Sequence, residues 1–179
     1  MASLRLATIK DIDDILNIFK SAVALLKGQG IDQWQNGYPN KEQAVIDIQK
    51  GLSYVLIYEG EVAAVGTITT ETDPSYTAIE GSWIENDSPV YASLHRIAVS
   101  NKFRGKRLGQ LMLASLVEKC RELSLNDVRV DTHTDNKAMQ ALVYKRGFEY
   151  RGIIPKYGGT SSRLAYQLLI DCSDKEHGG

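Results

Sequence analysis

The chain has 179 residues, with 21 basic and 22 acidic side chains and a formal net charge of −1. This length is enough for one domain with a full hydrophobic core, and the balanced charge argues against a protein that binds nucleic acid or a membrane surface. Two cysteines without a C-x-x-C spacing indicate a reducing compartment. No apolar run approaches the ~20 residues that cross a bilayer, and the first residues do not resemble a signal peptide. We therefore expect a cytoplasmic protein with a single domain over residues 1–171 and a polar tail over residues 172–179.

The first part of the chain predicts a strand and two helices. Residues 4–7 are suited to a short strand, and Thr8 and Asp11 have the spacing of a capping box at the start of a helix. Apolar side chains then recur at helical spacing until Gly28, which ends the helix. Asn40 is a favourable cap for a second helix. The residues expected on the buried face of this second helix are Val45 and Ile48.

The middle of the chain predicts three strands and a third helix. Residues 54–58 and 62–69 are largely apolar and are separated by Glu-Gly, which is a hairpin signal. Residues 71–89 are mostly polar, and we expect a long irregular connection there, a kind of segment that often carries function. Residues 91–99 predict the fourth strand, and residues 105–123 predict a helix with one apolar face.

The last third of the chain completes the pattern. It predicts a fifth strand at residues 127–132, a fourth helix from Asn136 to Gly147, and two further strands at residues 148–152 and 163–170. The predicted order is therefore β-α-α-β-β-β-α-β-α-β-β. Such a mixture of strands and helices in one chain indicates the α/β (α+β) class.

The loop between the fourth strand and the third helix is the most informative segment. It reads Arg104-Gly105-Lys106-Arg107-Leu108-Gly109 and leads directly into the helix. The first amides of a helix have no partner within it and carry partial positive charge, glycines let a ligand approach the backbone, and Lys and Arg add full charges. The loop therefore predicts a site for a phosphate-bearing ligand. A solvated basic turn and a nucleic-acid contact are alternative interpretations of the same cations.

This loop resembles the acyl-CoA loop of the GNAT superfamily of N-acyltransferases. In the family, Gln or Arg is followed by two variable residues, Gly, one variable residue, and Gly or Ala, and the loop holds the pyrophosphate of CoA. Arg107 stands at the family's middle glycine, and we expect it to donate its backbone amide, which requires a negative φ. The resemblance implies acetyl-CoA as the cosubstrate. No pair of His or Cys residues has the spacing of a metal site, so no metal is expected.

A second segment resembles the other GNAT signature, in which an Asn precedes a helix that ends in Leu-Tyr, three variable residues, Gly and Phe. The resemblance implies that Asn136 bonds to the pantetheine arm, and a plain helix cap is the alternative interpretation. The family tyrosine, which protonates the leaving CoA thiolate, corresponds to Val143, and Tyr144 follows it. At about 100° per residue, Val143 lies roughly 20° from Asn136 around the helix and Tyr144 roughly 80°. Tyr144 is the candidate acid, with Tyr157 and bound water as rivals.

The resemblance also implies a fold. The GNAT fold has a mixed, mostly antiparallel seven-stranded sheet flanked by about four helices, and its parallel strands 4 and 5 splay apart to admit pantetheine. The arm pairs with the backbone of the fourth strand, which corresponds to residues 97–99 here. The residues assigned to the cofactor are Ile97, Ala98, Val99, Arg104, Gly105, Lys106, Arg107, Leu108, Gly109, Gln110, Asn136, Met139 and Val143.

The implied reaction is direct attack of a neutral amine on the acyl-CoA thioester in a ternary complex. It requires a base for the amine, stabilisation of the oxyanion and a proton for the thiolate. A backbone amide near Val99 is the candidate for the oxyanion. The candidate bases are His95, Glu80, Glu85 and His133. Histidine has an ordinary pKa suited to this work, so His95 is the candidate we carry forward, and a purely structural histidine is the alternative.

Four aromatic residues lie in or beside the segments that form the acceptor pocket in the family: Trp34, Tyr38, Trp83 and Tyr91. They are suited to an apolar group or, through cation–π contact, to an ammonium, and anchoring of loops to the core is the alternative interpretation. The sequence thus predicts an N-acetyltransferase for an unidentified primary amine, as a monomer or homodimer, without nucleic-acid or membrane partners. The alternative is a CoA-binding regulatory or interaction module with little turnover, which Val143 at the tyrosine position favours.

Overall fold

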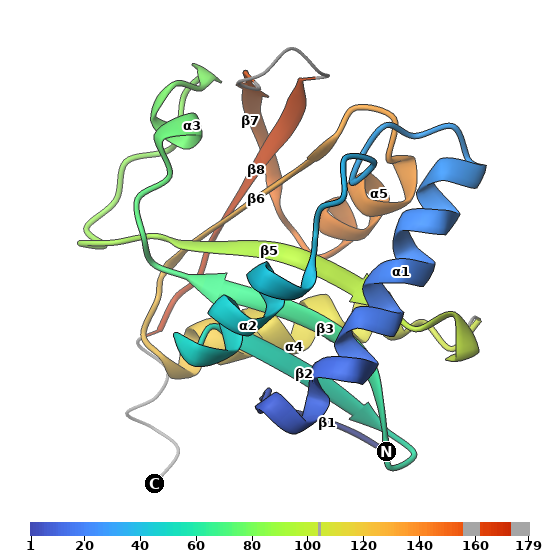
Figure 1. Cartoon of the computed structure of the whole chain (residues 1–179). Helices are drawn as coiled ribbons and strands as arrows, with labels where there is room; N and C mark the ends of the chain where they lie inside the picture. Colours follow the sequence, from blue (N-terminus) through green and yellow to red (C-terminus); the bar gives the residue numbers. More distant parts are fainter. Residues whose placement is uncertain (104, 156–161, 173–179) are drawn as a thin grey trace, which may run out of the picture.

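One mixed sheet forms the centre of the computed structural model, which describes residues 1–103, 105–155 and 162–172 (Figure 1). Its strands are β1 (Ala2–Leu6), β2 (Ser53–Tyr58), β3 (Glu61–Thr69), β4 (Glu80–Gly81), β5 (Ala92–Val99), β6 (Asp127–His133), β7 (Glu149–Ile154) and β8 (Arg163–Leu169). They lie in the order β1-β2-β3-β5-β6-β8-β7-β4, and every neighbouring pair is antiparallel except β5 and β6. The expected class of fold is confirmed.

Helices cover both faces of this sheet. They are α1 (Ile12–Gly28) and α2 (Lys41–Gln49) on one face, and α4 (Leu108–Glu122) and α5 (Lys137–Lys145) on the other. On the first face, Phe19 of α1 lies in one hydrophobic cluster with Val65 of β3. On the second face, Leu116 of α4 lies in another cluster with Leu94 of β5. The middle of the sheet is therefore buried on both sides, as is usual where parallel strands occur.

The parallel pair separates part-way along its length. Residues 92–94 of β5 are in register with residues 128–130 of β6, and beyond Leu94 and Val130 the two strands have no further paired residues in the described chain. Arg96 follows at once with a φ of +52°, where the register between β5 and β3 shifts. A bulge of this kind bends a strand and re-aims its side chains. The expected splay of the two strands is confirmed, and the bulge marks the point where it begins.

The segment at residues 71–89 is more ordered than the sequence indicated. It contains a short helix, α3 (Pro74–Thr77), and the two-residue strand β4. β4 pairs with β7 so closely that a Cβ on Gly81 would meet the carbonyl oxygen of Arg151, and one on Gly152 would meet that of Glu80. The partner of β4 is about seventy residues away in the chain, so no local pattern announces this strand.

Two helix starts test the sequence interpretation. The backbone N–H of Thr8 donates to the Asp11 carboxylate at 2.8 Å, as the capping box predicts. The third predicted helix, α4, begins at Leu108 and not at Gly105. Gly105 and Arg107 have φ values of +80° and +56°, and a residue with left-handed backbone cannot belong to a right-handed helix.

The buried face of α2 also differs from the expectation. Ala44 and Asp47 are its buried residues, whereas Val45 and Ile48 are only half-buried. A carboxylate takes the place of an apolar side chain because Arg96 of β5 pairs with Asp47 beneath the helix. Burial of such a pair requires that both charges are satisfied.

Parts of the predicted chain lie outside the described residues: Arg104, the segment 156–161 with Tyr157, and residues 173–179 of the expected tail. Among the residues that are described, no helix has the length and apolar character to cross a membrane. The same residues contain no group of three or more His, Cys, Asp or Glu side chains placed to hold a metal ion.

Candidate active site

A cavity of about 420 Å³, here called the main cleft, lies where β5 and β6 separate. Residues 94–99 of β5 and 130–132 of β6 form its floor, and α1, α5 and the first turn of α4 form its walls. Of the residues assigned to the cofactor, those that line it are Ile97, Ala98, Val99, Gly105, Arg107, Leu108, Gly109, Asn136 and Met139. Segments far apart in the chain thus meet where the sequence predicted a single site.

Three of the assigned residues do not line the main cleft, and a fourth is not among the described residues. Lys106 and Gln110 are exposed and do not line the main cleft. Val143 is 0% exposed and belongs to the core under α4, so it packs inside the protein and does not face the cleft. Arg104 lies outside the described residues. Of the described cations in this loop, Arg107 lines the cleft. The loop can therefore offer a ligand its backbone and the side chain of Arg107.

The start of α4 has the properties of an anion site. No side chain of the described residues caps this helix, and the N–H of Leu111 donates to the carbonyl of Arg107 at 3.2 Å. The amides of the first turn therefore keep their hydrogen-bonding capacity beside the cleft. The expectation that Arg107 has a negative φ is wrong, because its φ is +56°, in the left-handed region that favours glycine.

Asn136 is committed to two protein partners. Its Oδ1 accepts from the N–H of Met139 at 3.1 Å, which makes it the cap of α5, and its Nδ2 donates to Oε1 of Gln33 at 2.9 Å. Gln33 is only 8% exposed and also lines the main cleft. The capping interpretation is thus present in the structure, and the bond to Gln33 ties the loop after α1 to the start of α5. The sequence did not single out Gln33, because its partner is 103 positions away.

The candidate acid does not reach the cleft. The side chain of Tyr144 is 77% exposed on the outer face of α5 and is absent from the lining of the main cleft. Val143 and Tyr144 are neighbours on one helix, so the inward position holds a valine and the tyrosine points to solvent. The geometry gives no support to Tyr144 as the acid.

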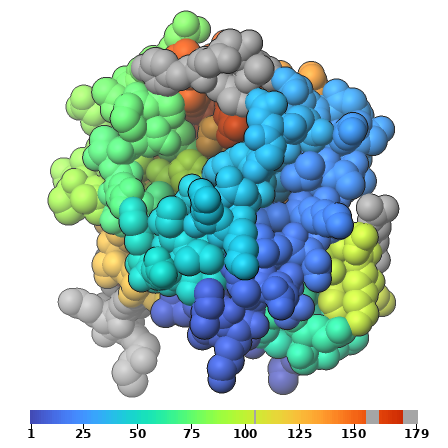
Figure 2. Space-filling model, in the orientation of Figure 1, coloured from blue at the N-terminus to red at the C-terminus, as the bar shows by residue number. Residues whose placement is uncertain are grey.

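A second hollow, here called the side cavity, opens beside the main cleft with a volume of about 520 Å³. Its wall includes Asp32, Trp34, Tyr38, Asp73, Ser75, His95, Arg96, Asp131 and Arg163. In the space-filling view this face is hollowed between the segment before α3, in green, and the loop that precedes α2, in blue (Figure 2). His95 and Asp131 line both hollows, so the two spaces meet at these side chains.

His95 is the one candidate base that lies at this junction. Its imidazole is 21% exposed, and Nδ1 is 4.0 Å from Oδ1 of Asp131. Burial lowers its pKa below the ordinary value of 6.5; Asp131 opposes that effect, and Arg96 adds to it. His95 is therefore neutral and able to accept a proton at neutral pH. The other candidates, Glu80, Glu85 and His133, line neither the main cleft nor the side cavity.

Arg96 connects three parts of the molecule beneath the side cavity. Its guanidinium donates to both carboxylate oxygens of Asp47 at 2.7 and 2.8 Å, and to the hydroxyl of Tyr38 at 2.7 Å. Hydrogen bonds to Asp47 and Tyr38 raise the pKa of Arg96 even though burial opposes this. This arrangement was not found from the sequence. The signal was a carboxylate at a buried position of α2, which the apolar spacing led us to overlook.

Trp34 and Tyr38 lie at the junction of the two hollows, and their contact with an acceptor stays a prediction. Both line the main cleft and the side cavity. Trp34 is also buried against Phe19, with ring centroids 6.1 Å apart at an edge-on angle of 78°. The anchoring and lining interpretations of Trp34 therefore hold together.

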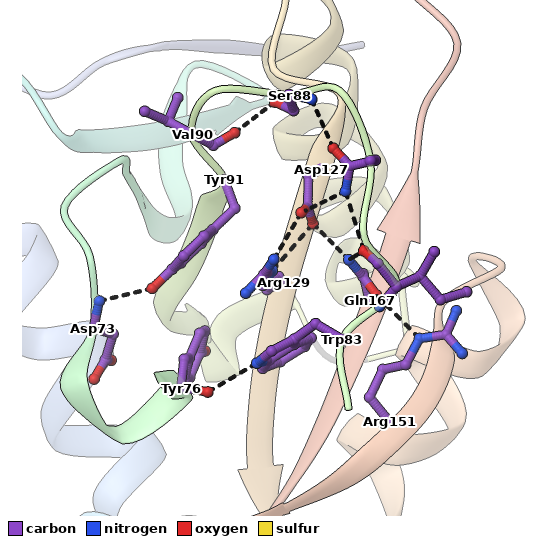
Figure 3. Close-up of polar contacts among 12 residues, drawn as sticks. Asp73, Tyr76, Trp83, Ser88, Val90, Tyr91, Asp127, Arg129, Arg151 and Gln167 are labelled. Atoms are coloured by element: carbon purple, nitrogen blue, oxygen red, sulfur yellow. Dashed lines mark hydrogen bonds and ion pairs between the residues drawn. The ribbon is translucent and has the colours of Figure 1, made fainter. Parts of the chain in front are cut away.

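Trp83 and Tyr91 have a different role from the one expected. They enclose the guanidinium of Arg129, which lies 4.4 Å from the Trp83 ring and 4.0 Å from the Tyr91 ring (Figure 3). Arg129 also pairs with Asp127 at 2.8 Å. The faces of these two rings thus hold a cation of the protein itself, and neither residue lines the main cleft or the side cavity.

This cluster fixes the segment between β4 and β5. The side chain of Gln167 accepts from the N–H of Ile84 at 2.9 Å and donates to its carbonyl at 3.2 Å, as a neighbouring strand would. Gln167 also donates to Asp127, and Asn86 donates to the same carboxylate (Figure 3). These bonds hold Ile84 and Asn86 against β8 and β6.

Comparison with known proteins now decides the family. The sequence profile of the Acetyltransferase (GNAT) family matches residues 19–148, which is well over half of the chain. The chain belongs to this family. An acetyltransferase of the GNAT family from Streptococcus agalactiae has a similar structure, with 36% sequence identity, a TM-score of 0.86, and coverage of 95% of this chain and 96% of that one.

Two further GNAT relatives are more distant. The uncharacterized N-acetyltransferase YesJ of Bacillus subtilis is 25% identical over 151 residues, which are 82% of this chain and 81% of YesJ. The fold is also shared with yncA of Salmonella typhimurium, solved with its cofactor acetyl-CoA, at a TM-score of 0.66 and 17% identity over 99% of this chain and 96% of that one. At this identity the second likeness concerns the fold alone.

Proposed function

We propose that the protein is an N-acetyltransferase that transfers an acetyl group from acetyl-CoA to a primary amine by direct attack in a ternary complex. The observation that carries this proposal is the meeting of the main cleft and the side cavity at His95. One hollow is suited to the arm of the donor and the other to the acceptor, and a base lies between them. The resemblance of the fold to yncA with acetyl-CoA supports the choice of donor.

The residues of the main cleft fit CoA on structural grounds. The uncapped first turn of α4 offers amides to phosphates, and Arg107 adds a full charge. The edge of β5 that faces the cleft beyond Leu94 is free to pair with the amides of pantetheine. Oγ1 of Thr132 is buried, lines the cleft and has no hydrogen-bond partner in the described chain. When bound, acetyl-CoA would supply an acyl thioester at this floor.

The chain's own part in the reaction is to hold the amine and to take its proton. His95, kept neutral by burial, accepts the proton through the ring nitrogen that does not face Asp131. A backbone N–H near Val99 is placed on the cleft floor to stabilise negative charge on the acyl oxygen. The acid for the thiolate is then water or Tyr157, since Tyr144 faces outward.

The side cavity favours a cationic acceptor. Asp32 and Asp73 line it and have no ion pair with Lys or Arg among the described residues, whereas Arg96 and Arg163 are each paired with an aspartate. The unpaired carboxylates attract an ammonium, and Trp34 adds an aromatic wall. An amine that carries no carboxylate of its own is therefore the acceptor class that fits best.

A CoA-binding module with little turnover is the second candidate function. The observation that favours it is the placement of α5, where the family's tyrosine position holds buried Val143 and Tyr144 faces solvent. Such a protein would bind acetyl-CoA as tightly but would not release free CoA when an amine is added.

Calorimetry with acetyl-CoA, followed by a panel of amines with detection of free CoA thiol, separates these functions. The panel should contain monoamines, diamines and amino acids of equal chain length. Binding together with amine-dependent thiol release, highest for diamines and lowest for amino acids, supports the proposed enzyme. Binding without amine-dependent release supports the module, and absence of binding contradicts both.

A further inference from the structure

A histidine and an aspartate lie side by side at the point where the sheet divides. His95 follows Leu94 on β5 and Asp131 follows Val130 on β6, so each is the first residue past the last paired position. Side chains at the same level of parallel strands face the same side of the sheet. Nδ1 of His95 accordingly lies 4.0 Å from Oδ1 of Asp131.

The Asp131 carboxylate is held by two other elements. Oδ1 accepts a bond from the hydroxyl of Tyr76 in α3 at 2.9 Å, and Oδ2 accepts from Nη1 of Arg163 in β8 at 3.3 Å. The Asp131 side chain is 7% exposed and Tyr76 is 1% exposed. Burial raises the pKa of Tyr76 well above its ordinary value, so this hydroxyl keeps its proton and remains a donor. The carboxylate is thus fixed before any substrate arrives.

We propose that Asp131 is a positioning residue for His95, which holds the imidazole with Nδ1 toward β6 and stabilises the imidazolium that forms during turnover. This inference rests on the proposed function, in which His95 is the base. In the neutral state the 4.0 Å separation is longer than a hydrogen bond. When the other ring nitrogen takes the proton of the amine, Nδ1 keeps its own proton, and the ring becomes a cation facing a carboxylate.

The charged groups that face His95 determine the equilibrium between its neutral and protonated ring. Burial, Arg96 and Arg163 disfavour the charged ring, whereas Asp131 and Asp73 favour it, Asp131 more strongly. The neutral hydroxyl of Tyr76 shares the Asp131 charge. Burial therefore keeps the ring unprotonated before reaction, and Asp131 limits the free-energy cost of the cation that reaction creates.

The test is an NMR titration of the His95 ring in the full-length protein, with His95→Gln used to assign its signal among the three histidines. Asp131→Asn removes the charge and should lower the titration midpoint of His95 by about one pH unit, the usual effect of one opposite charge at this range. The acidic limb of kcat/KM should move by the same amount.

Asp127→Asn is the matched control. Asp127 is a buried carboxylate of the same strand, 2% exposed, and its partners are Arg129 and Gln167. Its removal perturbs a similar buried network four residues from Asp131 without touching His95. The His95 midpoint should stay at the wild-type value in this variant.

Tyr76→Phe should shift the titration midpoint of His95 in the direction opposite to the shift expected for Asp131→Asn. Without the hydroxyl, the Asp131 charge is less shared, so the His95 midpoint should rise while the aromatic packing remains. If Asp131→Asn shifts the midpoint no further than Asp127→Asn does, the proposal is overturned. If Asp131→Asn does not fold, Tyr76→Phe decides, and an unchanged or lower midpoint overturns it. The NMR titration does not require turnover. If the protein is inactive with every amine, the proposed function is contradicted, but the effect of Asp131 on the titration midpoint of His95 can still be measured.

Discussion

Arg107 combines a left-handed backbone with a cationic side chain at the mouth of the main cleft. Its φ of +56° places it where an L-residue loses roughly 1–2 kcal/mol through crowding between Cβ and the carbonyl oxygen. A glycine would adopt the same conformation without this strain. Strain that persists beside a cleft points to a role for the side chain, and this favours the proposed role of Arg107, which is to bring charge toward a phosphate of the donor.

Arg107→Gly should therefore separate stability from affinity. We expect an unchanged or higher Tm, because the left-handed strain disappears, and weaker acetyl-CoA binding by about 1.5–3 kcal/mol, the value of a hydrogen bond to a charged group. Thermal unfolding and calorimetry measure the two effects. Lys106→Ala, at an exposed neighbour that does not line the cleft, is the control and should change affinity much less. Equal affinity of wild type and Arg107→Gly would show that the loop binds through its backbone alone.

Tyr144→Phe should leave turnover intact. Its side chain is 77% exposed and turned away from the cleft, so its hydroxyl has no path to the thiolate. We expect kcat and the alkaline limb of the pH profile to match those of the wild type in a steady-state assay. A clear fall in kcat with normal stability would mean that α5 rotates or shifts when the donor binds.

At the scale of elements, Arg96 holds one wall of the side cavity to the sheet. Its bonds to Asp47 and Tyr38 join β5, α2 and the loop before α2, and they do so beneath the side cavity. The exposed fractions of the Arg96 and Asp47 side chains are 11% and 3%, so the pair is largely withdrawn from water. Breaking one side of such a pair leaves an uncompensated buried charge.

Asp47→Ala should destabilise the protein by about 3–5 kcal/mol, the usual cost of removing one partner of a buried ion pair. Chemical denaturation measures the free energy of unfolding. Glu71→Ala breaks the exposed pair with Lys50 at the same end of α2 and should cost at most about 1 kcal/mol. Similar losses in the two variants would mean that Asp47 is solvated in solution.

The elements that sequence could predict are those set by local periodicity. The helix at Ile12–Gly28 and the strands at Ser53–Tyr58 and Glu61–Thr69 follow from apolar spacing, a capping box and a hairpin signal. β4 could not be predicted, because it exists only through its contact with β7. The loop before α4 was recognised from its glycines and cations, which are contiguous.

The candidate site was predicted only in part, because sequence patterns show local groups of residues and not contacts between distant ones. Residues close in sequence, such as those of β5 and the loop before α4, do line one cleft together, and their contact with CoA stays a prediction. Pairs that span many residues were missed, and Arg96 with Asp47 is separated by 49 positions. Trp83 and Tyr91 were assigned to an acceptor from the segments in which they lie, whereas in the structure their rings hold the guanidinium of Arg129. Sequence alone does not show whether an aromatic ring contacts a cation of the protein or a cation of a ligand.

At the scale of the whole molecule, titration of two side chains should make stability depend on pH. The pKa of His95 is lowered by burial, so below its ordinary value of 6.5 the unfolded chain binds a proton that the folded chain does not. Stability is fully present above that value and falls as pH decreases toward the folded pKa. The pKa of Asp11 is lowered by its hydrogen bond to Arg5, so its contribution is lost only below the ordinary value of 3.8.

His95→Gln should remove the loss of stability that protonation of His95 causes below pH 6.5. Urea denaturation at pH 7.5 and pH 5.5 should show a smaller drop in the free energy of unfolding for this variant than for the wild type. Asp11→Asn should show the same drop in the free energy of unfolding as the wild type between pH 7.5 and pH 5.5, because Asp11 affects stability only below pH 3.8. An identical drop in wild type and His95→Gln would show that the ring is as easily protonated in the folded state as in the unfolded chain.

The early end of pairing between β5 and β6 has one more consequence. Past Leu94 and Val130, β5 and β6 no longer pair with each other in the described chain, so the sheet has two internal edges in addition to its outer edges. Open edges are templates for pairing with other chains and a common route to aggregation. Here α1 and α5 stand on either side of the opening. Such walls admit a narrow, flexible arm and exclude a full strand with its side chains. The same defect in the sheet can thus receive a ligand without recruiting another copy of the protein.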